Sequence, residues 1–229
     1  MTKFDIYAAD YDAALHQGLS ATGESKDFFA LNRIAWLARC LRLLGETPVH
    51  ALDFGCGTGS ATPFLFDQIA VKSVVGLDVS PASLETARRT HDSESVSFLL
   101  FDQYEPEGQI DLAFSNGVFH HIAPSERPQA LSYLYRSLRA GGLFALWENN
   151  PWNPGTRYVM SRIPFDRDAI ALTARTARAL LRAEGFQILR TDFLFIFPRA
   201  LGMFRGIEKL ITRLPLGGQY QVLCRKPHS

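Results

Sequence analysis

The segment from Val49 to Ser60, VHALDFGCGTGS, limits the fold of this 229-residue chain more than any other. A short apolar run predicts a buried strand, and Gly55, Gly57 and Gly59 follow it before a helix-like segment begins. Glycine adopts positive φ and leaves the backbone uncovered, and the first N–H groups of a helix have no partners within the helix. The segment therefore predicts a strand–turn–helix unit whose turn faces a ligand.

The rest of the chain alternates short apolar segments with amphipathic ones, which predicts a mostly parallel sheet with helices on both faces. Apolar residues at three- and four-residue spacing predict a helical cap over residues 1–46. The expected strands are 49–54, 73–78, 96–101, 110–115, 142–148, 186–196 and 219–225. The expected helices between them are 60–70, 81–91, 125–139 and 173–184.

The length and the lack of a linker or repeat predict one domain over residues 1–229. Within it we expect the cap, a cofactor-binding core at 47–150 and an acceptor-side region at 151–229, with an insertion at 199–214. The first 150 residues carry 18 acidic and 11 basic side chains, whereas the remainder carries 5 acidic and 13 basic ones. This division argues against a nucleic-acid-binding surface that extends over the whole protein. A local basic surface formed by the last third of the chain remains open.

The chain shows no features of a secreted or membrane-spanning protein. Its apolar runs are shorter than the ~20 residues that cross a bilayer, and its first ten residues lack the apolar core of a signal peptide. The 3 cysteines form no CxxC pair, which argues against a disulfide framework or a structural zinc site. We therefore expect a cytoplasmic protein with no metal.

Two acidic residues follow successive expected strands. Asp78 ends the second strand, where a carboxylate can accept hydrogen bonds from ribose hydroxyls. Asp102 ends the third strand, where it could bind the exocyclic amine of adenine. Taken alone, either acid could be a solvated turn residue, but two in succession favour a nucleoside ligand.

The spacing of the turn distinguishes between two nucleoside cofactors. The dinucleotide fingerprint is GxGxxG, whereas this chain has GxGxG with Ser60 at the place of the third glycine. Asp53 precedes the turn by two residues and suits a ligand that carries an ammonium group. These features favour S-adenosylmethionine over the cofactor of an NAD(P)-dependent oxidoreductase. A non-catalytic S-adenosylmethionine-binding protein remains an alternative.

Three successive motifs resemble those of the class I S-adenosylmethionine-dependent methyltransferases: LDFGCGTGS, VVGLDVSPASLETAR and the strand ending at Asp102. FDIYAADYD at 4–12 and SNGVFHHI at 115–122 are similar to the branch that includes ubiquinone and menaquinone biosynthesis methyltransferases. The resemblance implies a Rossmann-like, seven-stranded α/β sheet whose last strand is antiparallel. It also implies a cofactor site made of Tyr11, Asp53, Gly55, Gly57, Gly59, Asp78, Val79, Asp102, Ser115 and Asn116.

Candidate acceptor-side residues follow the fourth and fifth expected strands. His120 and His121 are candidate general bases, although packing against a helix explains either one equally well. The proline-containing loop after the fifth strand could contact an acceptor, or it could be a plain connection. No Asn-Pro-Pro-aromatic motif follows strand four, which argues against methylation of a nucleic-acid base. The candidate substrate residues of the loop are Glu148, Asn149, Asn150, Trp152 and Asn153.

The insertion at 199–214 has apolar residues at helical spacing with basic residues between them. Such a helix could lie on a membrane surface, cover a lipophilic pocket or simply pack on the sheet edge. We therefore expect a methyltransferase that acts by in-line displacement on a small, lipophilic acceptor, lipid-like or anionic, with peripheral membrane contact. The residues of the pattern are Leu201, Phe204, Ile207, Leu210, Ile211 and Leu214, with Arg199, Arg205, Lys209 and Arg213 between them.

Overall fold

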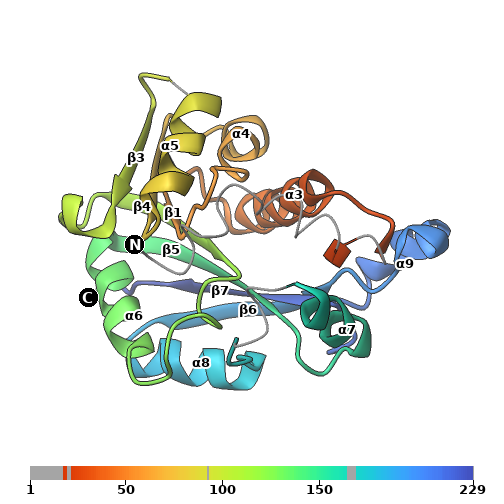
Figure 1. The fold of residues 1–229 in the computed structure, drawn as a ribbon. Coiled ribbons are helices and arrows are strands. Elements are labelled where there is room, and N and C mark those ends of the chain that lie inside the picture. The colour runs from red at the N-terminus through yellow and green to blue at the C-terminus, as the bar shows by residue number, and fades with distance from the viewer. Residues whose placement is uncertain (1–17, 20–21, 92, 164–168, 229) are drawn as a thin grey trace.

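The protein forms a seven-stranded sheet with the order β3-β2-β1-β4-β5-β7-β6, as Figure 1 shows. This computed structural model describes residues 18–19, 22–91, 93–163 and 169–228. The strands are β1 (His50–Phe54), β2 (Ser73–Asp78), β3 (Val96–Leu100), β4 (Ile110–Asn116), β5 (Leu138–Asn149), β6 (Gln187–Leu194) and β7 (Gln219–Arg225).

The direction of the strands follows the expected pattern. The strands β1 to β5 pair in parallel, and β7 lies between β5 and β6 and runs antiparallel to both. All seven predicted strands are confirmed, as is the antiparallel last strand. Parallel neighbours bring the carboxyl ends of β1, β2 and β4 to one edge, where ligands bind in open α/β sheets.

The helices cover the sheet on both faces. In Figure 1, α3, α4 and α5 lie on one face, and α6 and α8 lie on the other. The helices are α3 (Lys26–Leu44), α4 (Thr62–Phe64) with a π-helical turn at Leu65–Ile69, α5 (Pro81–Thr90), α6 (Arg127–Ser137), α7 (Pro154–Arg162), α8 (Ala174–Ala183) and α9 (Arg205–Glu208). None of the helices in the described ranges is long and apolar enough to cross a bilayer.

The helix α3 confirms the described part of the predicted N-terminal cap. Ser25 begins it by accepting a hydrogen bond from the Phe28 N–H, and Gly45 ends it with a φ of 71°. Its apolar face buries Ile34 and Leu37 against the sheet. Each such side chain contributes about 1.5–3 kcal/mol when fully buried, so α3 is firmly attached to the core.

Two segments differ from the prediction. Pro154–Arg162, where no helix was expected, form α7, because the Asn153 side chain accepts from the Thr156 N–H and Pro154 fits the first helical position. The expected helix at 199–214 is wrong: a 3₁₀ segment (Arg199–Phe204), kinked at Leu201, leads into the short α9. Gly202 and Gly206 disfavour a continuous helix there.

Candidate functional site

Two neighbouring cavities open at the carboxyl ends of the parallel strands. The turn cavity, about 450 Å³, lies against the glycine turn and Asp78. The outer cavity, about 500 Å³, is walled by the start of α3, by α7 and by residues 195–198. Asn116, Gly117 and His121 line both cavities. The end of β4 is therefore the place where ligands in the two cavities would meet.

The glycine turn is built as the sequence predicts. Gly55, Gly57 and Gly59 have φ values of 76°, 53° and 77°, which disfavour other residues. A Cβ atom on Gly55 would lie 2.3 Å from a methyl group of Val118, whereas one on Gly57 would meet no atom within 4 Å. Gly55 thus serves close packing, and Gly57 leaves open space toward the turn cavity, which it lines.

Asp78 is held in place by the same turn. Its carboxylate accepts hydrogen bonds from the Gly57 N–H at 2.8 Å and from the Ser80 N–H at 2.9 Å. It lines the turn cavity together with Val79, which is half exposed. The end of β2 therefore presents a fixed carboxylate and an apolar side chain to a ligand.

Asp53 lies on β1, below the turn, and is almost fully buried. Burial raises the pKa of Asp53 to about 7, and the charge of Asp78 adds to this effect. A buried carboxylate beside a second one is costly in water-free surroundings, and a cation placed nearby would offset that cost. The pair thus makes this end of the site suited to a positively charged ligand.

The other predicted cofactor residues take different places. Asp102 is exposed, and its neighbour Phe101 lines the turn cavity instead. Ser115 is buried at the end of β4, while Asn116 reaches both cavities. Among the described residues, no hydrogen-bond partner is found for Ser115 Oγ or Asn116 Oδ1. Tyr11 lies outside the described residues.

His120 and Glu148 form a buried pair at the floor of the outer cavity. Glu148 Oε2 lies 2.6 Å from His120 Nδ1, and Glu148 Oε1 accepts from the Phe119 N–H at 2.7 Å. The ring of His121 lies 4.1 Å from that of His120, centroid to centroid. Both histidines line the outer cavity. Glu148, predicted as a substrate contact, is 2% exposed and instead holds His120 and the turn after β4.

The loop after β5 divides into cavity and scaffold residues. Asn149 and Asn153 line the outer cavity. Asn150 is buried, and its amide donates to the carbonyl oxygens of Pro215 and Gly217, so it joins two loops. Trp152 is 73% exposed and does not line the cavity. Of the five predicted substrate residues, the structure brings two to the cavity wall.

Sequence reasoning missed most of the outer cavity wall. Phe28, Phe29, Phe195, Phe197 and Tyr158 supply aromatic surface from three distant segments. Phe28 belongs to the apolar spacing that predicts the N-terminal helical cap, and no motif marks the others as a cavity wall. Their shared role depends on the tertiary fold, which brings the start of α3 beside residues 195–198.

Charged groups are also present in that wall. The Arg33 guanidinium lies within 6.0 Å of the Phe29 and Phe195 ring centroids, and its Nε donates to Gln219 at 2.8 Å. Lys26 Nζ donates to Thr58 Oγ1 at 3.1 Å, which ties α3 to the glycine turn. The outer cavity thus combines an aromatic surface with fixed cationic groups.

The comparison with known families agrees with this geometry. A family model described as a methyltransferase domain matches residues 52–144, which run from β1 into β5 and include the glycine turn and Asp78. The seven-stranded sheet and its antiparallel last strand agree with the fold that the resemblance to class I S-adenosylmethionine-dependent methyltransferases implies. These comparisons support S-adenosylmethionine as the cofactor of this methyltransferase domain.

Curated relatives of the methyltransferase domain include enzymes of more than one acceptor class. The chain is 28% identical over 167 residues to malonyl-[acyl-carrier protein] O-methyltransferase 1 of Ilyobacter polytropus, covering 66% of this chain and 61% of that protein. It is 28% identical over 139 residues to trans-aconitate 2-methyltransferase of Methylobacterium nodulans, covering 61% and 53% respectively. The match thus spans less than two thirds of these relatives' length. They do not single out the ubiquinone and menaquinone branch.

A solved structure matches over nearly the whole chain. The plantazolicin methyltransferase BamL, solved with S-adenosylhomocysteine (SAH) and a triazolic desmethylPZN analogue, has a TM-score of 0.64; the match covers 98% of this chain and 99% of that chain. Its sequence identity is 15%, so the likeness concerns the fold. The likeness in fold therefore extends beyond residues 52–144 into the C-terminal part of the chain.

Proposed function

We propose that this protein transfers a methyl group from S-adenosylmethionine to a small, lipophilic acceptor bound in the outer cavity. The observation that carries the proposal is the junction of the two cavities at Asn116, Gly117 and His121. Methyl transfer by in-line displacement needs two ligands aligned end to end, and such alignment supplies roughly 7–11 kcal/mol of barrier reduction.

Several features in the turn cavity, or buried beside it in the case of Asp53, fit the cofactor. The buried carboxylate of Asp53 suits a cationic ligand, and Gly57 leaves open space above the backbone. Asn116 Oδ1 is a buried acceptor at the junction with no hydrogen-bond partner among the described residues. Asp78 and Val79 would hold the ribose and adenine. Bound there, S-adenosylmethionine supplies the methyl group carried by its cationic sulfur.

His120 would remove the proton of the acceptor. Glu148 accepts the Nδ1–H of His120, so Nε2 is the nitrogen that can take a proton. After proton transfer, the carboxylate of Glu148 stabilises the imidazolium across the 2.6 Å contact. A positioned base of this kind contributes about 10²–10⁴-fold to a rate.

The walls of the outer cavity define the class of acceptor. Phe28, Phe195 and Tyr158 suit a lipophilic body, and Arg33 suits an oxygen-rich or anionic group on it. The two relatives are named for malonyl-[acyl-carrier protein] and trans-aconitate, which supports an acceptor with a carboxyl or similar group. A cytoplasmic location with peripheral membrane contact through residues 199–214 remains part of the proposal.

The first test is titration calorimetry of the protein with S-adenosylmethionine and, separately, with NAD. We expect binding of the first and none of the second, and the Asp78→Asn protein should bind S-adenosylmethionine more weakly. Binding of NAD with no response to S-adenosylmethionine would overturn the proposal in favour of an oxidoreductase.

The second test follows formation of SAH with a panel of lipophilic phenols and carboxylic acids. Turnover with any member identifies an enzyme, and comparison of methyl ethers with methyl esters among the products identifies the acceptor group. Tight cofactor binding with no turnover across the panel would favour a non-catalytic binding protein.

A further inference from the structure

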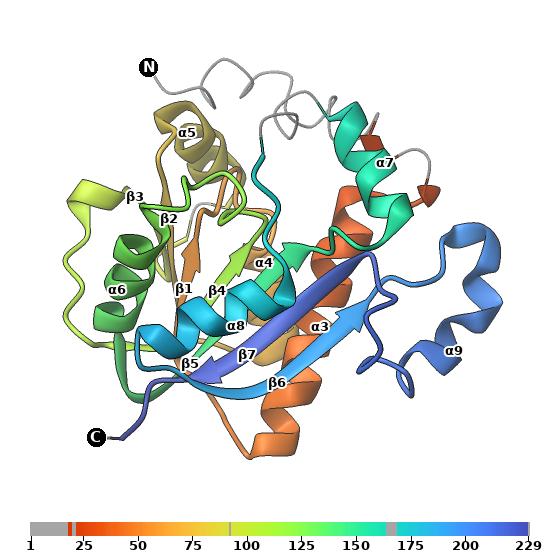
Figure 2. The ribbon, with the colours of Figure 1, turned by 90° about the horizontal axis from the view of Figure 1, so that it is seen from below.

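The tip segment, residues 199–216, presents apolar side chains to solvent. Met203 and Leu210 are 86% and 83% exposed. Figures 1 and 2 both show α9, part of this segment, projecting beyond the end of the sheet. Contiguous exposed apolar surface is uncommon on monomeric proteins and marks interaction sites. The other exposed apolar residues of the tip segment are Leu201, Phe204, Ile207, Leu214 and Leu216.

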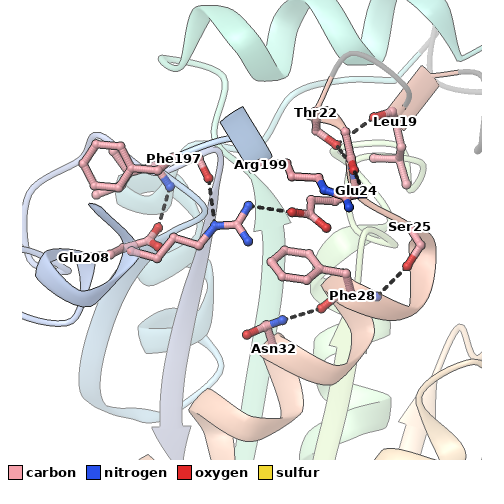
Figure 3. A network of polar contacts seen from close by, with 12 residues as sticks. Leu19, Thr22, Glu24, Ser25, Phe28, Asn32, Phe197, Arg199 and Glu208 are labelled. Carbon is pink, nitrogen blue, oxygen red and sulfur yellow. Dashed lines mark hydrogen bonds and ion pairs between the residues drawn. The ribbon is translucent and has the colours of Figure 1, made fainter. Parts of the chain in front are cut away.

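The tip segment is anchored to the body at both of its ends. Near its end, the Phe193 N–H donates to the Thr212 carbonyl oxygen at 2.7 Å, and Arg213 donates to the Thr191 carbonyl oxygen at 3.1 Å. In its first half, Arg205 donates to Glu24 at 2.7 Å and lies 4.6 Å from the centre of the Phe28 ring, in the network that Figure 3 shows. These contacts therefore hold the tip segment in place, with its apolar side chains exposed to solvent.

In the tip segment, most of the basic side chains are exposed and the single acidic side chain is half-buried. Its only acidic residue, Glu208, is half-buried and accepts a hydrogen bond from the Ile196 N–H. Arg199, Lys209 and Arg213 are exposed. The outer surface of the tip segment thus combines apolar and basic side chains. Interfacial protein segments that bind anionic membranes have this combination.

The tip segment is continuous with the outer cavity. Phe197 lines that cavity, and its ring lies 5.8 Å from the ring of the exposed Phe204, centroid to centroid. Arg205 also lines the cavity. An apolar path therefore leads from the exposed surface of the tip segment to the cavity wall.

We infer that the tip segment docks on an anionic phospholipid surface, so that the outer cavity opens beside the bilayer and takes its acceptor from it. The inference of docking is based on the exposed apolar and basic side chains of the tip segment. The delivery of an acceptor rests on the proposed methyltransferase function.

The test is flotation of the full chain with vesicles of phosphatidylcholine alone and of phosphatidylcholine with phosphatidylglycerol. We expect the protein to float with the anionic vesicles and to be released from them by high salt. The variant Met203→Glu/Leu210→Glu should bind at least about tenfold less, because each substitution removes an apolar side chain and adds repulsion.

The matched control is Leu43→Glu, which changes another exposed leucine, 67% exposed, at the far end of α3. It should float like the wild-type protein. Thermal unfolding of both variants should match the wild type, because the replaced side chains lie in solvent. Absence of wild-type flotation, or equal flotation of the tip variant, would overturn the inference.

Two further readouts separate the alternatives. A wild-type dimer in size-exclusion chromatography that Met203→Glu/Leu210→Glu converts to a monomer would make the tip segment a self-association surface and overturn the inference. Cofactor binding and turnover without flotation would refute the docking inference and leave the proposed function standing. Flotation without any S-adenosylmethionine binding would support docking and refute the proposed function.

Discussion

His120 Nδ1 lies 2.6 Å from Glu148 Oε2, and both side chains are buried below the outer cavity. The pair joins the turn after β4 to the end of β5. A buried carboxylate needs such a partner, because desolvation of an isolated charge is costly. In return it fixes the orientation and the tautomer of the imidazole, which is what a general base requires.

Glu148→Gln should lower turnover about 10²-fold or more while leaving the affinity for S-adenosylmethionine unchanged. The amide would present an N–H to Nδ1 and so favour the wrong tautomer of His120. The measurement is steady-state turnover at saturating cofactor, with calorimetry for affinity. His120→Ala should lose a similar factor, and the double variant should lose little more. Full turnover in Glu148→Gln would remove the pair from the mechanism.

Asp53→Asn should weaken cofactor binding and remove a pH dependence. Because burial and the Asp78 charge raise the pKa of Asp53 to about 7, the carboxyl is partly protonated at neutral pH. A cationic ligand binds the ionised form, so wild-type affinity should fall by up to about tenfold per pH unit below that pKa. The ratio of wild-type to variant affinity, measured by calorimetry, cancels the titration of the ligand. A ratio that stays constant with pH contradicts the assignment.

Asp53→Asn, which weakens cofactor binding, should stabilise the ligand-free protein at neutral pH. The carboxyl titrates near 3.8 when unfolded and at about 7 when folded, so the folded state binds its proton more tightly. Stability from this group is therefore complete below pH 3.8 and is lost as the pH rises to about 7. Relative to Asp53→Asn, the free energy of unfolding of the wild-type protein should decline across this window. Parallel pH profiles in urea unfolding would argue against the burial of the charge.

Gly55→Ala and Gly57→Ala should separate packing from ligand binding. The added methyl group at Gly55 would meet Val118 at 2.3 Å and destabilise the fold. At Gly57 it would meet no atom within 4 Å, so the cost is the positive φ alone, about 1 kcal/mol. Thermal unfolding should thus be lowered much more by Gly55→Ala. The cofactor affinity of folded Gly57→Ala should drop, since its Cβ enters the turn cavity; retention of full affinity would exclude close contact there.

Arg205→Gln should weaken the acceptor side of the site and leave the cofactor side intact. Arg205 joins the tip segment to Glu24 by an ion pair and to Phe28 of α3 by a cation–π contact; Figure 3 labels Glu24 and Phe28 in this network. We expect the KM for the acceptor to rise several-fold with cofactor affinity unchanged, because a partly exposed ion pair is worth about 0.2–1 kcal/mol. Glu24→Gln removes the other partner of the ion pair, and a double-mutant cycle with both variants measures the coupling energy between Arg205 and Glu24. Equal loss of cofactor binding would contradict a local role.

The sheet could be predicted from the sequence because each strand is short, apolar and separated from the next by an amphipathic or turn-forming segment. The pairing of His120 with Glu148 could not be predicted, although the sequence marks both as candidate site residues. It depends on the register of β4 and β5, in which Asn116 is opposite Trp147, so that Glu148 follows directly beside the turn that holds His120. A single sequence does not report which residues two parallel strands place opposite each other.

The acceptor side was predicted less well, for related reasons. The asparagine and proline at 153–154 are typical of loops and of helix starts alike, and here they begin α7. The apolar spacing at 199–214 predicted a helix, but two glycines and the anchoring of Thr212 produce short turns instead. The wall of the outer cavity comes from segments far apart in the chain, and its aromatic residues carry no local pattern.

In the proposed reaction, cofactor and acceptor would meet at Asn116, Gly117 and His121, because these residues line both cavities. A single molecule in which an acceptor fragment is tethered to the sulfur atom of S-adenosylhomocysteine through a short linker would occupy both sites together. Such a bisubstrate inhibitor would gain from the high effective concentration of its second half. Varying that acceptor fragment would then survey the selectivity of the outer cavity by affinity alone.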